Sequence, residues 1–162
     1  MAFDTQGVRI LVVDDDKELA DGLVEYLSDL GYSAVAANSG QEGLNRFENG
    51  AFQLVITDLK MPEMDGIELL EAVKARDRQA VVMVITGHGT IESAVKATKK
   101  GAYDFITKPV KMEELEVIIN RALERHRLYR QLGVFRGLTL ALIISVPLWL
   151  ILGIVFAVLW KR

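Results

Sequence analysis

The sequence predicts an α/β fold with a five-stranded parallel sheet and helices on both of its faces. Over about the first 125 residues, short apolar runs alternate with segments of helical periodicity, which is typical of consecutive βαβ units. Four of these runs end on or beside Asp, Thr or Lys residues. The carboxyl ends of parallel strands share one edge of the sheet, where such folds bind ligands. The 162 residues suit one such domain plus an appendage.

Each strand is expected over an apolar run that polar or glycine residues bound. These runs cover residues 9–13, 33–36, 54–57, 81–85 and 103–106. The helix between the first two strands has a row of large side chains on one face and is expected to stop at Gly31. That row is Leu19, Leu23, Tyr26, Leu27 and Leu30.

Capping residues place the other helices. Ser39 and Glu42 have the spacing of a capping box and are expected to open the second helix. Residues 61–66 form a loop that leads into the third helix, and Thr90 is expected to cap the fourth. A fifth helix is expected to begin near Met112 and to continue toward the C-terminal segment.

Composition and charge exclude several function classes. There are no cysteines, which excludes disulfides and thiolate metal sites, and the N-terminus lacks a signal-peptide pattern. Residues 1–120 carry a net charge of −9, whereas residues 121–162 carry +6. An acidic body argues against nucleic-acid binding by that body, and the basic stem has a membrane surface as its candidate partner.

The residues at the strand ends predict phosphate chemistry. Asp14, Asp15 and Asp58 would repel one another without a cation, and oxygen ligands of this kind suit Mg²⁺. A carboxylate beside Mg²⁺ can attack a phosphoryl group, whose charge Lys108 and Thr86 could compensate. Taken singly, each residue is more often a cap or a surface group; the full set at strand ends favours the functional interpretation. We assign Asp16 to capping the first helix.

Four segments together resemble the receiver domain of two-component response regulators. They are VVDD over residues 12–15, TDLKMPEMDG over 57–66, ITGHG over 85–89 and FITKP over 105–109. The resemblance covers residues 7–127 and is closest to receivers of nitrogen-regulator or nodulation-type subfamilies. It implies a flavodoxin-like sheet of strand order 2-1-3-4-5 and a protein that catalyses only its own phosphorylation and dephosphorylation.

The resemblance also implies a role for each site residue. Asp58 would be the phosphoacceptor, and Asp14, Asp15 and the Lys60 carbonyl would complete its Mg²⁺ site. Lys108 would contact the phosphoryl group and precede a cis peptide bond to Pro109. Thr86 and Phe105 would be the switch pair that responds to phosphorylation. Lys60 and His88, each two residues after a site residue, would set the lifetime of the phosphorylated state. His126 has no such role and is expected to be structural or exposed.

Residues 138–160 predict a single transmembrane helix. These 23 residues carry no charge, and as a helix they would span about 34 Å, enough for a hydrocarbon core of about 30 Å. A buried core helix is the alternative, but the five-stranded domain already has helices for both faces. Five arginines precede the span and two basic residues follow it, which predicts that the domain faces the cytoplasm. Residues 128–137 would be a basic juxtamembrane stem that continues the fifth helix.

These features predict a receiver on the inner membrane, phosphorylated by a sensor histidine kinase or a phosphotransfer protein. No DNA-binding segment is recognisable, so we expect signalling by protein contacts, including a homodimer through the fourth helix, fifth strand and fifth helix. The alternatives are a phosphorylation-independent membrane adaptor, a phosphatase of the haloacid-dehalogenase type, whose Asp-x-Asp motif fits poorly here, and a fragment or artificial fusion.

Overall fold

The computed structural model describes residues 5, 7–47, 52–109, 111–127, 145, 147, 149 and 160. The chain divides into two compact units, Met1–His126 and Arg127–Arg162. The first unit contains the sheet and all the residues expected to form the site.

The sheet has five strands in the order β2-β1-β3-β4-β5, and every neighbouring pair is parallel. Their bounds are β1 (Arg9–Val13), β2 (Ser33–Ala37), β3 (Leu54–Thr57), β4 (Val81–Thr86) and β5 (Asp104–Thr107). The parallel sheet and its strand order are confirmed. Successive side chains of β1, β3 and β4 enter the two cores alternately, one on each side of the sheet. These three strands are therefore buried along nearly their whole length.

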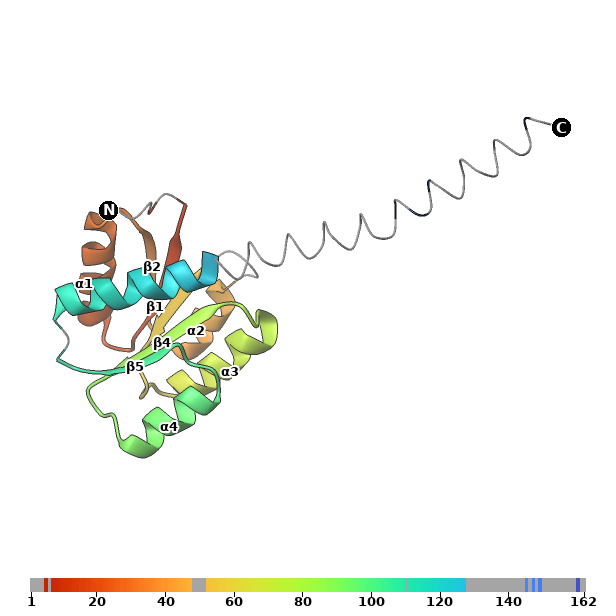
Figure 1. Ribbon diagram of the computed structural model, residues 1–162. Coiled ribbons are helices and arrows are strands. Elements are labelled where there is room, and N and C mark those ends of the chain that lie inside the picture. The colour runs from red at the N-terminus through yellow and green to blue at the C-terminus, as the bar shows by residue number, and fades with distance from the viewer. Residues whose placement is uncertain are drawn as a thin grey trace. The chain divides into compact units, whose positions relative to one another are not determined.

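Helices cover both faces of the sheet (Figure 1). They are α1 (Lys17–Asp29), α2 (Gly40–Arg46), α3 (Gly66–Arg76), α4 (Ile91–Lys99) and a helix over residues 112–127. On one face, Leu27 of α1 and Ile119 of the 112–127 helix pack with Ile56 of β3. The other face is covered by α2, α3 and α4, whose core includes Leu69 and Ala97.

The caps follow the sequence closely. Asp16 accepts hydrogen bonds from the backbone of Glu18 and Leu19, which confirms it as the cap of α1. Thr90 caps α4 in a reciprocal capping box with Ser93. The box expected at the start of α2 is only half formed: Ser39 accepts from the Glu42 backbone, but the Glu42 carboxylate accepts from the backbone of Asn38 instead.

Polar contacts at both ends and in the middle fasten the 112–127 helix to other elements of the domain. The Tyr26 hydroxyl donates to the Met112 carbonyl at 3.1 Å, and the Tyr32 hydroxyl donates to Asn120 at 2.6 Å. At the far end of the helix, Nδ1 of His126 lies 2.9 Å from the Gln79 carbonyl oxygen, in the loop before β4. His126 is 6% exposed, so it is a structural residue, one of the two roles expected for it.

The structure does not describe the segment expected to cross a membrane. The stem over 128–137 lies outside the described residues, and so does the span over 138–160 apart from four helical positions, residues 145, 147, 149 and 160. Among the residues described, no helix has the length and apolar character that a membrane crossing requires.

Candidate functional site

Two carboxylates and one ammonium group meet where β1, β3 and β5 end. Asp14 follows β1 and Asp58 follows β3, and each residue is 8% exposed. Lys108 follows β5, and its Nζ lies 2.8 Å from Oδ2 of Asp14 and 3.2 Å from Oδ1 of Asp58. Three residues separated by up to 94 positions in the chain therefore form one charged cluster, because their strands are parallel and end at one edge.

Backbone groups hold the second oxygen of each carboxylate. Oδ1 of Asp14 accepts from the Asp16 backbone N–H at 3.0 Å, and Oδ2 of Asp58 accepts from the Lys60 N–H at 2.7 Å. Each carboxylate is thus fixed by one backbone donor and one ammonium.

Opposing effects act on the Lys108 ammonium. Its partial burial lowers the pKa, but the hydrogen bonds and negative charges of Asp14 and Asp58 outweigh that effect. The pKa of Lys108 is therefore raised above its ordinary value, and the group is a cation at neutral pH.

A close backbone contact positions the loop after Asp58. Gly66 opens α3, and its N–H donates to the Leu59 carbonyl at 2.9 Å. A Cβ added at Gly66 would overlap the Asp58 carbonyl oxygen and lie 3.0 Å from the carbonyl carbon. Asp65 caps α3 in a reciprocal box with Glu68. The turn at residues 65–66 thus packs directly against the backbone of Asp58 and Leu59 and limits where that backbone can lie.

Thr86 and Phe105 lie on the two strands beyond β3. Thr86 ends β4, is fully buried, and accepts a hydrogen bond through Oγ1 from the His88 backbone N–H at 3.2 Å. Phe105 lies on β5, where it pairs in register with Val84, and its half-buried ring packs on the Leu59 and Ala97 cluster. The peptide bond between Lys108 and Pro109 is cis, as expected.

Asp15 does not join the charged cluster. Its side chain is exposed, and within the described residues no group of three or more His, Asp or Glu side chains is placed to hold a metal ion. The Lys108 ammonium bridges Asp14 and Asp58, and the role of Asp15 as a further Mg²⁺ ligand stays a prediction. Two carboxylates still fit Mg²⁺, because this ion is commonly bound through one or two carboxylates, with water and phosphate oxygens completing its shell.

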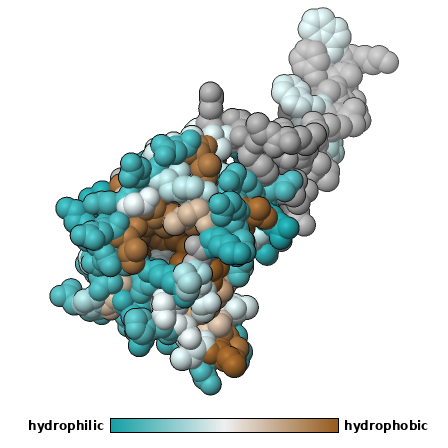
Figure 2. Space-filling model, turned by 90° about the vertical axis from the view of Figure 1, so that its left-hand side faces the viewer, coloured by the Kyte–Doolittle hydropathy of each residue, from teal (hydrophilic) through white to brown (hydrophobic). Residues whose placement is uncertain are grey.

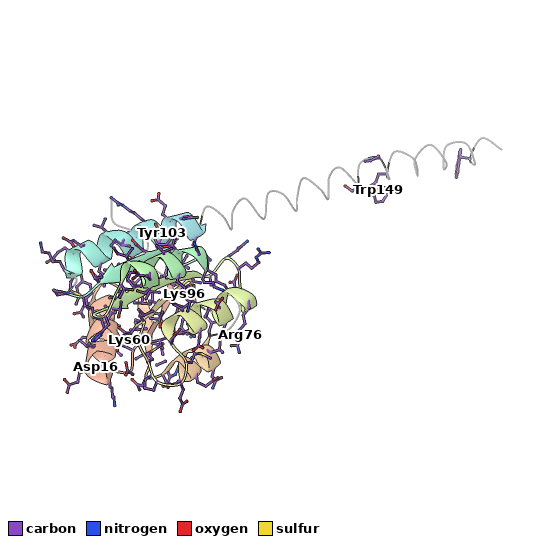
Figure 3. The ribbon with its side chains drawn as sticks, turned by 90° about the horizontal axis from the view of Figure 1, so that it is seen from below. Asp16, Lys60, Arg76, Lys96, Tyr103 and Trp149 are labelled. Atoms are coloured by element: carbon purple, nitrogen blue, oxygen red, sulfur yellow. The ribbon has the colours of Figure 1, made fainter. Side chains whose placement is uncertain are left out.

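Three of the residues labelled in Figure 3 show which end of the domain carries the site. Asp16 and Lys60 lie at the end of the domain where the strands end, and Arg76, the last residue of α3, lies toward the opposite end. Lys60 is exposed, so its side chain borders the site while its backbone binds Asp58.

An apolar cavity of about 480 Å³ adjoins the charged cluster. It lies between α1 and the start of the 112–127 helix, with Leu19, Leu23, Ile85 and Met112 among its lining residues. Figure 2 shows the corresponding hollow, which has an apolar floor and a hydrophilic rim. The sequence did not indicate this cavity. Leu19 was expected on the buried face of α1 but is 50% exposed, because its side chain lines this open cavity.

Comparison with known proteins identifies the family. The family model described as the response regulator receiver domain matches residues 10–120. The chain belongs to the response regulator receiver family. It is 40% identical over 132 residues to the nitrogen assimilation regulatory protein NtrX of Azorhizobium caulinodans, covering 80% of this chain and 29% of that protein. It is 42% identical over 117 residues to the transcriptional regulatory protein GlrR of Escherichia coli, covering 72% of this chain and 26% of that protein.

Solved structures of receivers have the same fold. A receiver domain protein from Clostridium thermocellum gives a TM-score of 0.72 at 34% identity, covering 75% of this chain and 98% of that one. NtrX from Brucella abortus gives 0.73 at 38% identity, covering 79% of this chain and 30% of that one. The chain thus spans less than a third of the length of the curated relatives it matches.

Proposed function

We propose that this receiver accepts a phosphoryl group on Asp58 from a sensor histidine kinase or a phosphotransfer protein. The observation that carries the proposal is the environment of Asp58, a buried carboxylate held by the Lys60 N–H at 2.7 Å and the Lys108 ammonium at 3.2 Å. Asp14 shares the same ammonium and follows β1, whereas Asp58 follows β3, the middle strand of the five.

The step is a nucleophilic displacement at phosphorus. A carboxylate oxygen of Asp58 forms a bond to phosphorus while the bond from phosphorus to the donor's imidazole nitrogen breaks, and the electron pair leaves with the imidazole. Negative charge is spread over the three phosphoryl oxygens during transfer. Lys108 would compensate this charge, and the buried hydroxyl of Thr86 at the end of β4 is the second group proposed for this role.

Asp14 and Asp58 would hold Mg²⁺, with Asp15 and the Lys60 carbonyl as the further ligands that the sequence suggests. The ion, when bound, would neutralise charge on the carboxylates and on the phosphoryl oxygens. The protein's own contribution is to orient both carboxylates through the backbone N–H groups of Asp16 and Lys60.

Readout would pass through Thr86 and Phe105 to the surface of α4 and β5. Ile91 and Val95 of α4 are 81% and 47% exposed, which supports protein contacts, including a homodimer, as the output. We propose Lys60 and His88 as the residues that set the lifetime of the phosphoaspartate, since both lie in loops that border the site. Enzymatic activity beyond this self-catalysed exchange is not part of the proposal.

A membrane tether is proposed on the sequence alone. The support is the charge-free run over residues 138–160 and the arginines that precede it. Alkaline extraction of membranes from cells that make the full chain tests the tether, because a peripheral protein is released and a spanning protein stays with the lipid.

Phosphorylation of the purified full chain tests the main proposal. Acetyl phosphate with Mg²⁺ should add one phosphoryl group, seen by intact mass, and Asp58→Asn should abolish the addition. Asp29→Asn, an exposed carboxylate at the end of α1, is the matched control and should label like the parent protein. Equal labelling of Asp58→Asn and the parent would contradict the assignment. A parent protein that never labels, and still binds partners, would instead favour the phosphorylation-independent adaptor.

A further inference from the structure

Gly89 lies in close contact with the ring of Phe105. A Cβ added at Gly89 would lie 2.8 Å from Cε1 of that ring and 3.2 Å from Cζ, and 3.0 Å from Cγ2 of Thr107. All three distances are shorter than an ordinary van der Waals contact of 3.4–4 Å. The space in which the ring lies therefore exists because residue 89 has no side chain.

The loop that carries Gly89 is fastened on both sides. Before it, the His88 N–H donates to Oγ1 of Thr86 at 3.2 Å. After it, Thr90 caps α4, and its N–H donates to Oγ of Ser93 at 2.9 Å. Moving the loop away from β5 would break one of these contacts. A side chain at position 89 is therefore accommodated most cheaply by moving the Phe105 ring, which is held by packing alone.

The ring position is linked to the phosphoacceptor loop. Phe105 packs on the cluster that contains Leu59, the residue directly after Asp58, and Val84 of β4. A ring that leaves this cluster changes the packing behind Asp58 and beside Thr86. Gly89 is thus connected to the site through one side chain rather than through a contact of its own.

We propose that Gly89 is a positioning residue of the switch, which keeps open the space that Phe105 occupies while Asp58 carries no phosphoryl group. This inference rests on the proposed function, because it assigns regulation of the same site. A side chain at position 89 would remove this ring position and shift the conformational equilibrium toward the phosphorylated arrangement before any phosphorylation.

Gly87 provides a matched control in the same loop. A Cβ added there would meet no atom within 4 Å, and neither Gly87 nor Gly89 has a positive φ. Gly87→Ala and Gly89→Ala therefore make the same chemical change two residues apart, with similar effects on the unfolded chain. Only Gly89→Ala displaces the ring.

The test uses the full chain labelled with fluorophenylalanine and observed by fluorine NMR, with the Phe105 resonance assigned from Phe105→Leu. Without any phosphoryl analogue, Gly89→Ala should shift the Phe105 resonance, and Gly87→Ala should not. Beryllofluoride with Mg²⁺ is then titrated. Gly89→Ala should lower its Kd by about tenfold, the scale expected for relieving one overpacked contact.

A double-mutant cycle separates this role from a general structural one. In the Phe105→Leu background, Gly89→Ala should change the Kd by less than about twofold, because the side chain through which Gly89 acts is absent. An unshifted Phe105 resonance in Gly89→Ala, a weaker affinity for beryllofluoride, or a full effect that persists in Phe105→Leu would each overturn the inference. Failure of the parent protein to bind beryllofluoride would count against the proposed function instead, since the resonance shift is measured without it.

Discussion

Replacing Lys108 by Met should destabilise the domain by removing the only cation that the structure places between Asp14 and Asp58 among its described residues. The two carboxylate side chains are 11% and 10% exposed, and the Lys108 side chain is 29% exposed. Breaking a fully buried ion pair costs about 3–5 kcal/mol, whereas exposed pairs contribute about 0–1 kcal/mol. Because water screens this cluster partly, we expect a loss of about 2 kcal/mol at neutral pH without Mg²⁺.

Urea denaturation of the full chain measures this loss, and Lys111→Met is its control. Lys111 lies three residues further along, and its contact with Glu114 is 3.8 Å long between side chains that are 78% and 66% exposed. The control should change the free energy of unfolding by less than about 0.5 kcal/mol. Added Mg²⁺ should restore part of the stability lost in Lys108→Met, since a bound cation stabilises the folded state by mass action. Equal urea midpoints for the two variants would refute this reasoning.

Further changes test the same site. The pKa of Lys108 is raised in the folded state, so its ion pairs stabilise fully below the ordinary value of 10.5, and this stabilisation is lost as pH rises through the raised pKa. The unfolding free energy of the parent should therefore fall more steeply above about pH 10.5 than that of Lys108→Met, as urea titrations at several pH values would show. Gly66→Ala should cost about 3 kcal/mol and lower the rate of labelling at Asp58, because the new Cβ overlaps the Asp58 carbonyl. Gly22→Ala on α1, where a Cβ meets no atom within 4 Å, should instead stabilise the domain by about 0.5–1 kcal/mol. The measurement is the melting temperature, which should rise.

The sequence predicted most of the sheet because its strands are short apolar runs with sharp polar ends. β1 and β3 have the bounds expected, whereas β2 continues to Ala37, β4 continues to Thr86 and β5 is shifted by one residue to Asp104–Thr107. Pairing between strands accounts for these three differences. Ala37 is the ladder partner of Val13, Thr86 is the ladder partner of Thr107, and the Lys108 N–H donates to the Thr86 carbonyl. Pairing of this kind is a tertiary property that a single run does not reveal.

At the site, the sequence identified the residues but not their arrangement. Asp14 and Asp15 are adjacent acidic residues after one strand, and only the structure shows that Asp14 meets Lys108 while Asp15 is exposed. The close approach of Gly89 to Phe105 is likewise invisible in the sequence, since it depends on how the loop after β4 lies against β5. The sequence predicts a loop over residues 61–66 but does not indicate that a Cβ at Gly66 would overlap the Asp58 carbonyl oxygen.

The helix over 112–127 has a mechanical consequence for the domain. It begins beside the phosphoacceptor edge, where Tyr26 binds the Met112 carbonyl, and ends beside the opposite edge, where His126 binds the Gln79 carbonyl. An α-helix of 16 residues is about 24 Å long and resists compression along its axis, because hydrogen bonds connect each turn to the next. Met112 and His126 are therefore the two ends of one stiff rod within the first unit, so a displacement of either residue along the helix axis would strain the contact made by the other.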